Sequence, residues 1–171
     1  MYKRILVPTD FSEFADRAVE HSVGLARTVK AEIVFLHAFV RPMVPALPAG
    51  ERALRQYLDE SLEAVNEQLE SLARRQEGVS CRAITTEGRP ADEIVSVASS
   101  EACDLICMST HGHGGLAHVL LGSVAERVIH RAPCPVLVIR VMTPRPKKKR
   151  RPRRRRKKPG SRLRIDEDGE Q

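Results

Sequence analysis

Short runs of apolar residues alternate along the chain with longer stretches in which apolar residues recur every three or four positions. The apolar runs lie at 5–7, 33–36, 105–108 and 136–139. Short apolar runs are typical of parallel strands whose two faces are both buried. A less apolar run at 79–85 predicts one more strand, at an edge of the sheet. The pattern therefore predicts five strands.

The stretches between the runs have the periodicity of amphipathic helices. Apolar positions within 15–29 predict the first helix, for which Asp10 or Ser12 is the expected N-cap. A longer helix is predicted over 51–76, with Gly78 as its C-terminal cap. Its stripe of leucines and valines suits either packing against a sheet or a coiled-coil seam, and packing against a sheet is the commoner arrangement.

Two shorter helices and one loop complete the pattern. Pro90 suits the first turn of a helix that follows it, and another helix is predicted within 119–130. The segment 41–50 contains three prolines and predicts an irregular loop.

Alternating strands and helices with short connections predict an α/β fold. We expect a doubly wound, five-stranded parallel sheet with helices on both faces. In such sheets ligands bind at the carboxyl ends of the strands, where the strand order reverses. Candidate functional residues are therefore those that follow the first, second and fourth strands: Pro8 to Asp10, His37 and Ala38, and the chain from Ser109 onward.

Charge is divided unevenly between the two parts of the chain. Residues 1–140 hold 15 Lys+Arg and 18 Asp+Glu, a net charge of −3, whereas residues 141–171 hold 14 and 4, a net charge of +10. A run so rich in one charge repels itself and buries nothing. We therefore expect one domain over 1–142 and a disordered basic tail over 143–171 with an acidic tip.

Cysteine usage and hydropathy indicate the compartment. The four cysteines form no Cys-x-x-Cys pair, and three of them lie in apolar runs, which predicts buried free thiols in a reducing environment. The apolar runs are too short for a signal peptide or a membrane span. We expect a cytoplasmic protein without a membrane span.

A glycine-rich segment follows the fourth predicted strand. It contains Gly112, Gly114 and Gly115, and Gly122-Ser123 then opens the next helix. Exposed backbone amides in such a segment, together with a helix N-terminus, form a cradle for phosphate. The alternative is that the glycines only make a tight turn and Ser123 only caps the helix. The segment is not a P-loop, because no Gly-Lys-Ser/Thr follows.

Several motifs, in order, resemble the universal stress protein family across residues 1–140. They are the opening Tyr-Lys-Arg-Ile-Leu-Val-Pro-Thr-Asp-Phe-Ser at 2–12, Gly-Arg-Pro-Ala at 88–91, Ser-Thr-His-Gly at 109–112, Gly-Ser at 122–123 and Ala-Pro-Cys-Pro-Val-Leu-Val at 132–138. The resemblance implies an adenine nucleotide α-hydrolase-like fold with strand order 3-2-1-4-5. It also implies an ATP-binding, regulatory stress-response protein that pairs as a homodimer through its last strand.

The resemblance also implies a nucleotide site, with Mg²⁺ bound alongside ATP near Asp10. Nucleotide-binding members carry Gly-x-x-Gly, nine residues, then Gly-Ser/Thr; Gly112, Gly122 and Ser123 match, but Ser109 stands at the first glycine. Its side chain falls where the strand end would meet the ribose or phosphates. The implied nucleotide-binding residues are Pro8, Thr9, Asp10, Ala38, Met108, Ser109, Thr110, His111, Gly112, His113, Gly114, Gly115, Gly122, Ser123 and Val124.

The sequence contains no set of nucleophile, base and acid, so no catalytic residue is predicted. The glycine-rich segment has neither Lys nor Arg to stabilise the charge of phosphoryl transfer. We expect binding without efficient turnover, with slow ATP hydrolysis as the upper limit. Histidines 111, 113 and 118 lie on a glycine-rich segment without fixed geometry, so a metal site of the protein alone is not expected. A phosphorelay receiver is excluded because its acidic phosphoacceptor and lysine are missing.

The basic tail predicts a second partner. It suits a polyanion, with nucleic acid first, bound without sequence preference because no aromatic residue lies among the basic ones. A stress protein that binds a polyanion through this tail and no nucleotide is the alternative function. The residues expected to bind the polyanion are Lys147, Lys148, Lys149, Arg150, Arg151, Arg153, Arg154, Arg155, Arg156, Lys157 and Lys158.

Overall fold

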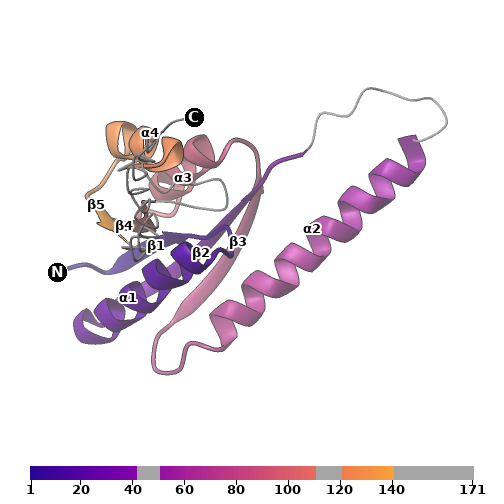
Figure 1. The fold of residues 1–171 in the computed structure, drawn as a ribbon. Helices are drawn as coiled ribbons and strands as arrows, with labels where there is room; N and C mark the ends of the chain where they lie inside the picture. Colours follow the sequence, from indigo (N-terminus) through magenta and orange to yellow (C-terminus); the bar gives the residue numbers. More distant parts are fainter. Residues whose placement is uncertain (42–50, 111–120, 141–171) are drawn as a thin grey trace, which may run out of the picture.

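The fold is built on a five-stranded parallel sheet, which confirms the predicted class and strand order. A computed structural model describes residues 1–41, 51–110 and 121–140. The strands follow one another in the order β3-β2-β1-β4-β5 (Figure 1). Each pair of neighbours is parallel, with registers such as Leu6 opposite Val34 and Ile106 opposite Val136. The strands are β1 (Arg4–Pro8), β2 (Glu32–Phe39), β3 (Cys81–Glu87), β4 (Leu105–Ser109) and β5 (Val136–Ile139).

Four helices connect the strands and cover both faces of the sheet. They are α1 (Glu13–Val29), α2 (Glu51–Arg74), α3 (Pro90–Ser100) and α4 (Ser123–Arg131). Alternate residues of each strand point to opposite faces, so Leu6 and Val34 pack with α3 and α4, whereas Ile5 and Phe35 pack with α1 and α2. Strands β1, β2 and β4 lie inside the sheet, and the continuous apolar run within each of them is buried, as predicted.

Helix α1 has two well-defined ends. Ser12 is its N-cap and accepts a hydrogen bond from the backbone N–H of Ala15 at 3.2 Å, which decides between the two caps that the sequence allowed. Its C-cap is Lys30, whose φ of +59° lies in the left-handed region and whose N–H donates to the carbonyl of Ala26. A glycine at this position would mark the end of the helix in the sequence, whereas a lysine does not.

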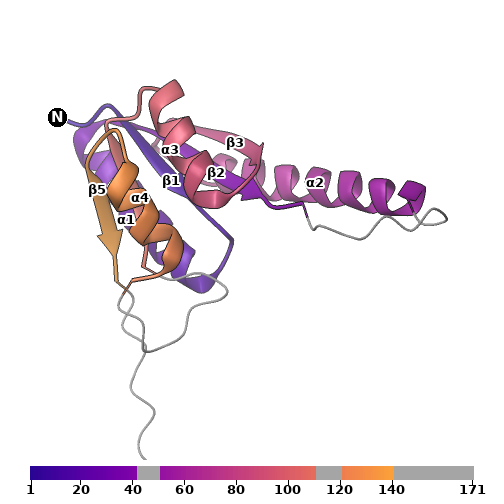
Figure 2. The same cartoon turned by 90° about the horizontal axis from the view of Figure 1, so that it is seen from above.

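Helix α2 packs against the sheet over only part of its length. Leu69 is fully buried and belongs to the core cluster with Leu72. The N-terminal half of the helix extends past the sheet in both views (Figures 1 and 2); Tyr57 there is 65% exposed, whereas Leu58 beside it is buried. The predicted packing against a sheet therefore holds for the C-terminal half.

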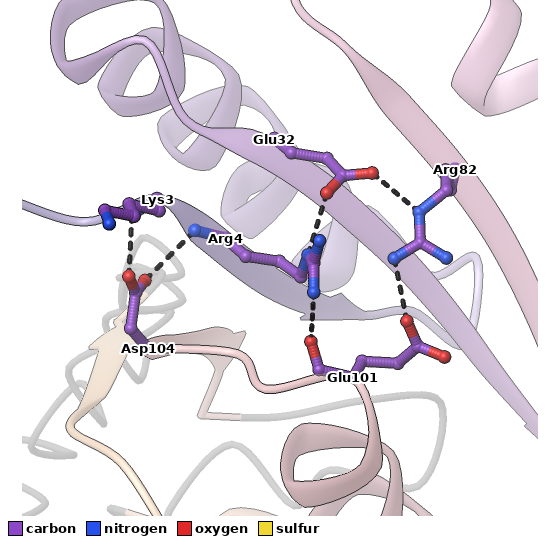
Figure 3. A network of polar contacts seen from close by, with 6 residues as sticks. All are labelled: Lys3, Arg4, Glu32, Arg82, Glu101 and Asp104. Carbon is purple, nitrogen blue, oxygen red and sulfur yellow. Dashed lines mark hydrogen bonds and ion pairs between the residues drawn. The ribbon is translucent and has the colours of Figure 1, made fainter.

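A polar network joins the amino ends of the strands (Figure 3). Glu32 at the start of β2 accepts hydrogen bonds from Arg4 on β1 at 2.7 Å and from Arg82 on β3 at 2.6 Å. Arg82 also bonds to the carboxylate of Glu101 at 2.8 Å, and Asp104 accepts the backbone N–H of Lys3 at 2.7 Å. The network thereby joins the amino ends of β1, β2 and β3 to the turn between α3 and β4.

The observed boundaries differ from the predicted ones by a few residues. Strand β3 begins at Cys81 rather than at 79, and it lies at an edge of the sheet as predicted. Helix α2 ends before Gly78, which has a φ of +73° in the turn that follows rather than serving as the cap. Within the described residues, no helix has the length and apolar content needed to cross a membrane. Residues 42–50 of the loop predicted at 41–50, and the predicted tail from 143, fall outside the described residues.

Candidate functional site

A cavity of about 400 Å³ lies at the carboxyl ends of β1, β2 and β4. This is the point where the strand order reverses between β1 and β4, so the chain turns to opposite sides of the sheet and leaves a crevice between. The polar network of Figure 3 joins the opposite ends of the same strands. The lining residues are Pro8, Thr9, Asp10, Ala15, Leu36, His37, Ala38, Pro90, Ile94, Met108, Ser109, Thr110, Gly122, Ser123, Val124 and Ala125.

The turn from β1 into α1 forms one wall of the cavity. Thr9 Oγ1 accepts the N–H of Phe11 at 3.0 Å, and Asp10 Oδ1 accepts the N–H of Ser12 at 3.1 Å and its hydroxyl at 2.6 Å. Side chains of Thr and Asp that bond two residues ahead close tight turns of this kind. The turn therefore holds the Asp10 carboxylate at the wall of the cavity while Ser12 caps α1.

Strand β2 holds this turn from the side. The N–H of Thr9 donates to the carbonyl of Leu36 at 2.9 Å, and the ring Nδ1 of His37 lies 2.9 Å from the carbonyl of Thr9. The His37 ring is also stacked on Phe11, with ring centroids 5.0 Å apart and an angle of 24° between the planes. Thr9 itself is buried, with 7% of its surface exposed.

The opposite wall comes from the end of β4 and the start of α4. The N–H of Thr110 donates to Ile139 at 3.1 Å, and the N–H of Gly122 donates to the carbonyl of Thr110 at 2.7 Å. The chain that leaves the sheet after Thr110 is therefore joined to it again at Gly122. Residues 111–120, which include the predicted His111 to Gly115, lie outside the described residues.

Helix α4 begins against the cavity. Its N-cap is Gly122, without a side-chain hydrogen bond at the cap, and Ser123 is the first helical residue. The alternative that Ser123 caps the helix is therefore wrong. A capping hydroxyl belongs to the N-cap residue, and that position is Gly122. The first amides of a helix have no partner inside it and carry the positive end of the helix dipole. Ser123 and Val124 thus bring amide groups to the cavity wall.

The family of this chain follows from its match to a sequence model. The model of the universal stress protein family matches residues 1–140. This chain belongs to the universal stress protein family. The match confirms the family that the sequence motifs suggested, over the whole α/β domain.

Individual universal stress proteins align over most of the chain. One from Methanocaldococcus jannaschii, MJ0531, is 39% identical over 147 residues, which cover 82% of this chain and 83% of that protein. One from Methanothermobacter thermautotrophicus is 38% identical and covers 83% and 98%. The solved structure of MJ0577, described as a structure-based assignment of biochemical function, has a TM-score of 0.68 at 32% identity and covers 84% and 99%.

Ten of the residues that the universal stress protein resemblance assigned to the site line this one cavity. They are Pro8, Thr9, Asp10, Ala38, Met108, Ser109, Thr110, Gly122, Ser123 and Val124. Six further lining residues were not among them: Ala15, Leu36, His37, Pro90, Ile94 and Ala125. The sequence pattern predicts that His37 lies at the end of the second strand. It does not predict the contact with Thr9, because the two residues are 28 positions apart.

The lining has a distinct chemical character. Leu36, Pro90 and Ile94 supply apolar surface, whereas Thr9, Ser109 and Ser123 supply hydroxyl groups. No lysine or arginine is found among the described residues that line the cavity. In the described part of the chain, no three His, Cys, Asp or Glu residues cluster as a metal site would require.

The cysteines do not form a reactive centre in this universal stress protein. All four are free, and Cys103 and Cys107 are buried. Burial raises the pKa of each thiol above its ordinary value, to about 11 for Cys103. Since the thiolate is the nucleophile, the raised pKa values lower the reactivity of these thiols near neutral pH.

Proposed function

We propose that this universal stress protein binds an adenine nucleotide, ATP with Mg²⁺, in the cavity at the carboxyl ends of β1, β2 and β4. The observation that carries the proposal is that ten residues assigned from sequence motifs, from three separate strand ends and the start of α4, line one cavity of about 400 Å³. Cavities that hold small cofactors have volumes of roughly 300–1,000 Å³.

The chemistry of the lining suits the two ends of a nucleotide. The apolar side chains of Leu36, Pro90 and Ile94 would contact the base, with Ala38 at the end of β2 beside it. The hydroxyls of Ser109 and Ser123 and the first amides of α4 would face the phosphates. Helix N-termini bind phosphate through free N–H groups and the helix dipole.

The Asp10 carboxylate at the cavity wall favours binding of ATP together with Mg²⁺. A carboxylate and a triphosphate repel each other, and no described lysine or arginine lines the cavity to offset this. Mg²⁺ is typically bound by one or two carboxylates together with phosphate oxygens. Asp10 and the hydroxyls near it therefore fit a nucleotide-bound Mg²⁺, which would neutralise phosphate charge.

Solved structures of the same fold add support. One is described as a universal stress protein in complex with cAMP, with a TM-score of 0.58, and one from Arabidopsis thaliana as having AMP bound, with a TM-score of 0.55. Each is 23% identical to this chain, so the likeness is one of fold. The assignment here rests on the cavity of this chain, and these structures favour an adenine nucleotide as the first ligand to test.

The experiment is a calorimetric titration of the full chain with MgATP. Ala38→Phe places a ring at the proposed base position and should abolish the heat of binding. Ala64→Phe makes the same change at an exposed position of α2 and is the matched control, with unchanged binding. Absence of heat with the unaltered protein at millimolar MgATP would overturn the proposal, and so would equal binding by both variants.

The regulatory role and homodimer that the family resemblance implies belong to the same proposal. Strand β5 lies at an edge of the sheet, and its residues Val136 to Ile139 are apolar and only half-buried. An exposed apolar edge strand is prone to pair with another chain. Sedimentation equilibrium should give twice the mass of one chain. The cytoplasmic location and the upper limit of slow ATP hydrolysis stay predictions.

A second candidate function concerns the basic tail, whose residues 147–158 contain eleven basic residues and one proline. This density favours binding to nucleic acid or another polyanion. Deletion of 144–171 should abolish retention on duplex DNA, and the intact chain should lose affinity with salt with a log–log slope of about −0.9 per phosphate contacted. Equal DNA binding by the truncated protein would contradict this role.

A further inference from the structure

Thr9 is held by β2 through both of its backbone polar groups. Its N–H donates to the carbonyl of Leu36 at 2.9 Å, and its carbonyl lies 2.9 Å from Nδ1 of His37. A carbonyl oxygen can only accept, so Nδ1 must carry the proton and donate it. The contact therefore fixes the tautomer of the neutral imidazole, with the proton on Nδ1.

The neighbouring Phe11 adopts a conformation that needs support. Its φ of +59° lies in the left-handed region, which non-glycine residues without a short polar side chain seldom adopt. The His37 ring is stacked on the Phe11 ring at a centroid distance of 5.0 Å, and the Phe11 N–H is bound by Thr9 Oγ1 at 3.0 Å. One histidine thus contacts the turn on either side of Asp10.

Asp10 lies between these two held residues. Its Oδ1 is tied to the N–H and hydroxyl of Ser12, so its orientation depends on the path of the backbone from Thr9 to Ser12. Both Asp10 and His37 line the cavity. A loose turn would let the carboxylate leave the cavity wall, and a carboxylate must be preorganised to contribute fully to binding.

We propose that His37 is a positioning residue, which holds the Thr9–Ser12 turn through Thr9 and Phe11 and thereby sets Asp10 for the metal-bound nucleotide. The inference rests on the proposed function for its ligand. The holding of the turn is a property of the protein alone and can be measured without a nucleotide.

Three substitutions separate the two contacts of the imidazole. His37→Phe keeps an aromatic ring for Phe11 but removes the donor to Thr9. His37→Asn keeps an N–H donor bonded to Cγ, as Nδ1 is, but removes the ring. Asp10→Asn removes the charge that the turn positions. His21→Phe makes the same exchange at an exposed histidine of α1 and controls for the general effect of the substitution.

The nucleotide-dependent test is a double-mutant cycle with MgATP. We expect His37→Phe to weaken MgATP binding by roughly three- to tenfold, the range that one hydrogen bond of ordinary net strength represents. His37→Asn should recover part of this loss. In the Asp10→Asn background, His37→Phe should have a much smaller effect, because the carboxylate it positions is gone. Additive losses would overturn the positioning role.

The nucleotide-free test is amide hydrogen exchange of the apo protein. His37→Phe should accelerate exchange at the Phe11 and Ser12 amides by roughly three- to tenfold, whereas His21→Phe should leave both unchanged. If the unaltered protein binds no MgATP, the proposed function fails while this exchange result still decides whether His37 holds the turn. Unchanged exchange at Phe11 and Ser12 in His37→Phe would overturn the inference whatever the nucleotide result.

Discussion

Replacing Glu32 with glutamine tests how the amino ends of the strands are held together. The carboxylate of Glu32 bonds to Arg4 Nε at 2.7 Å and to Arg82 Nε at 2.6 Å, and its side chain is 22% exposed. Glutamine keeps the shape but loses the charge, and its NH₂ group faces a guanidinium donor. The two arginines are 35% and 42% exposed, so solvent screens both pairs. We therefore expect a loss of about 1–2 kcal/mol in the free energy of unfolding at pH 7.

The assay is urea unfolding of both proteins at several pH values, with Glu70→Gln as control. Burial alone would raise the pKa of Glu32, but the hydrogen bonds from Arg4 and Arg82 outweigh it and place the pKa below its ordinary value of 4.5. A lowered pKa stabilises the fold above the unfolded-state pKa, and this stabilisation is lost as pH falls through the folded-state pKa. The difference between the two proteins should therefore be full at pH 7 and disappear in strong acid.

Two results would refute this reasoning about Glu32. One is an unchanged free energy of unfolding at pH 7, and the other is a difference that persists unchanged in strong acid. Glu70 pairs with Arg74 on the exposed surface of α2, where both side chains are at least 60% exposed. Its replacement should therefore cost less than about 0.5 kcal/mol. A thermal scan gives an independent check, since the expected loss at Glu32 corresponds to a fall in Tm of about 3–8 °C.

Three further predictions concern single residues. At pH 8 a thiol reagent should modify the half-buried Cys81 and Cys134 slowly and Cys103 only on unfolding, because burial raises its pKa to about 11; rapid modification of Cys103 in the native protein would contradict this. Gly88→Ala should lower the free energy of unfolding by about 1–2 kcal/mol, measured by urea unfolding, because Gly88 has a φ of +156°, which side-chain-bearing residues rarely adopt, and an added Cβ would also displace the Glu93 side chain. Ser109→Gly should weaken MgATP binding in calorimetry by roughly three- to tenfold, since it removes a hydroxyl that the proposal turns toward the phosphates, and tighter binding would contradict that contact.

Much of the fold could be predicted because its signals are local. The buried strands β1, β2 and β4 are continuous apolar runs, and the helices between them have clear periodicity. Pro90 marks the start of α3 for a reason contained in the residue itself, since it stands where no N–H partner is needed. Because ligands of such sheets bind at the carboxyl ends of the strands, the three strand ends also predict where the cavity lies.

Features that depend on tertiary contacts could not be predicted. The left-handed conformation of Lys30 has no local signature, because the chain turns there to begin β2 at Glu32 and a lysine occupies the place of the usual glycine. The contact of His37 with Thr9 and Phe11 joins β2 to the turn that follows β1, across more than 25 positions of sequence. Pro90 and Ile94 reach the cavity only because α3 covers the same face of the sheet as α4.

The most direct test of the nucleotide site is a set of ¹H–¹⁵N NMR spectra of the full chain, recorded as MgATP is added. The account predicts saturable shifts of amide signals around the cavity, at Thr9, Asp10, Ala38, Ser109 and Val124. Amides at the opposite ends of the strands, such as Glu32 and Asp104, should stay in place. Absence of shifts around the cavity at millimolar MgATP, or shifts confined to the basic residues beyond 143, would contradict the central claim.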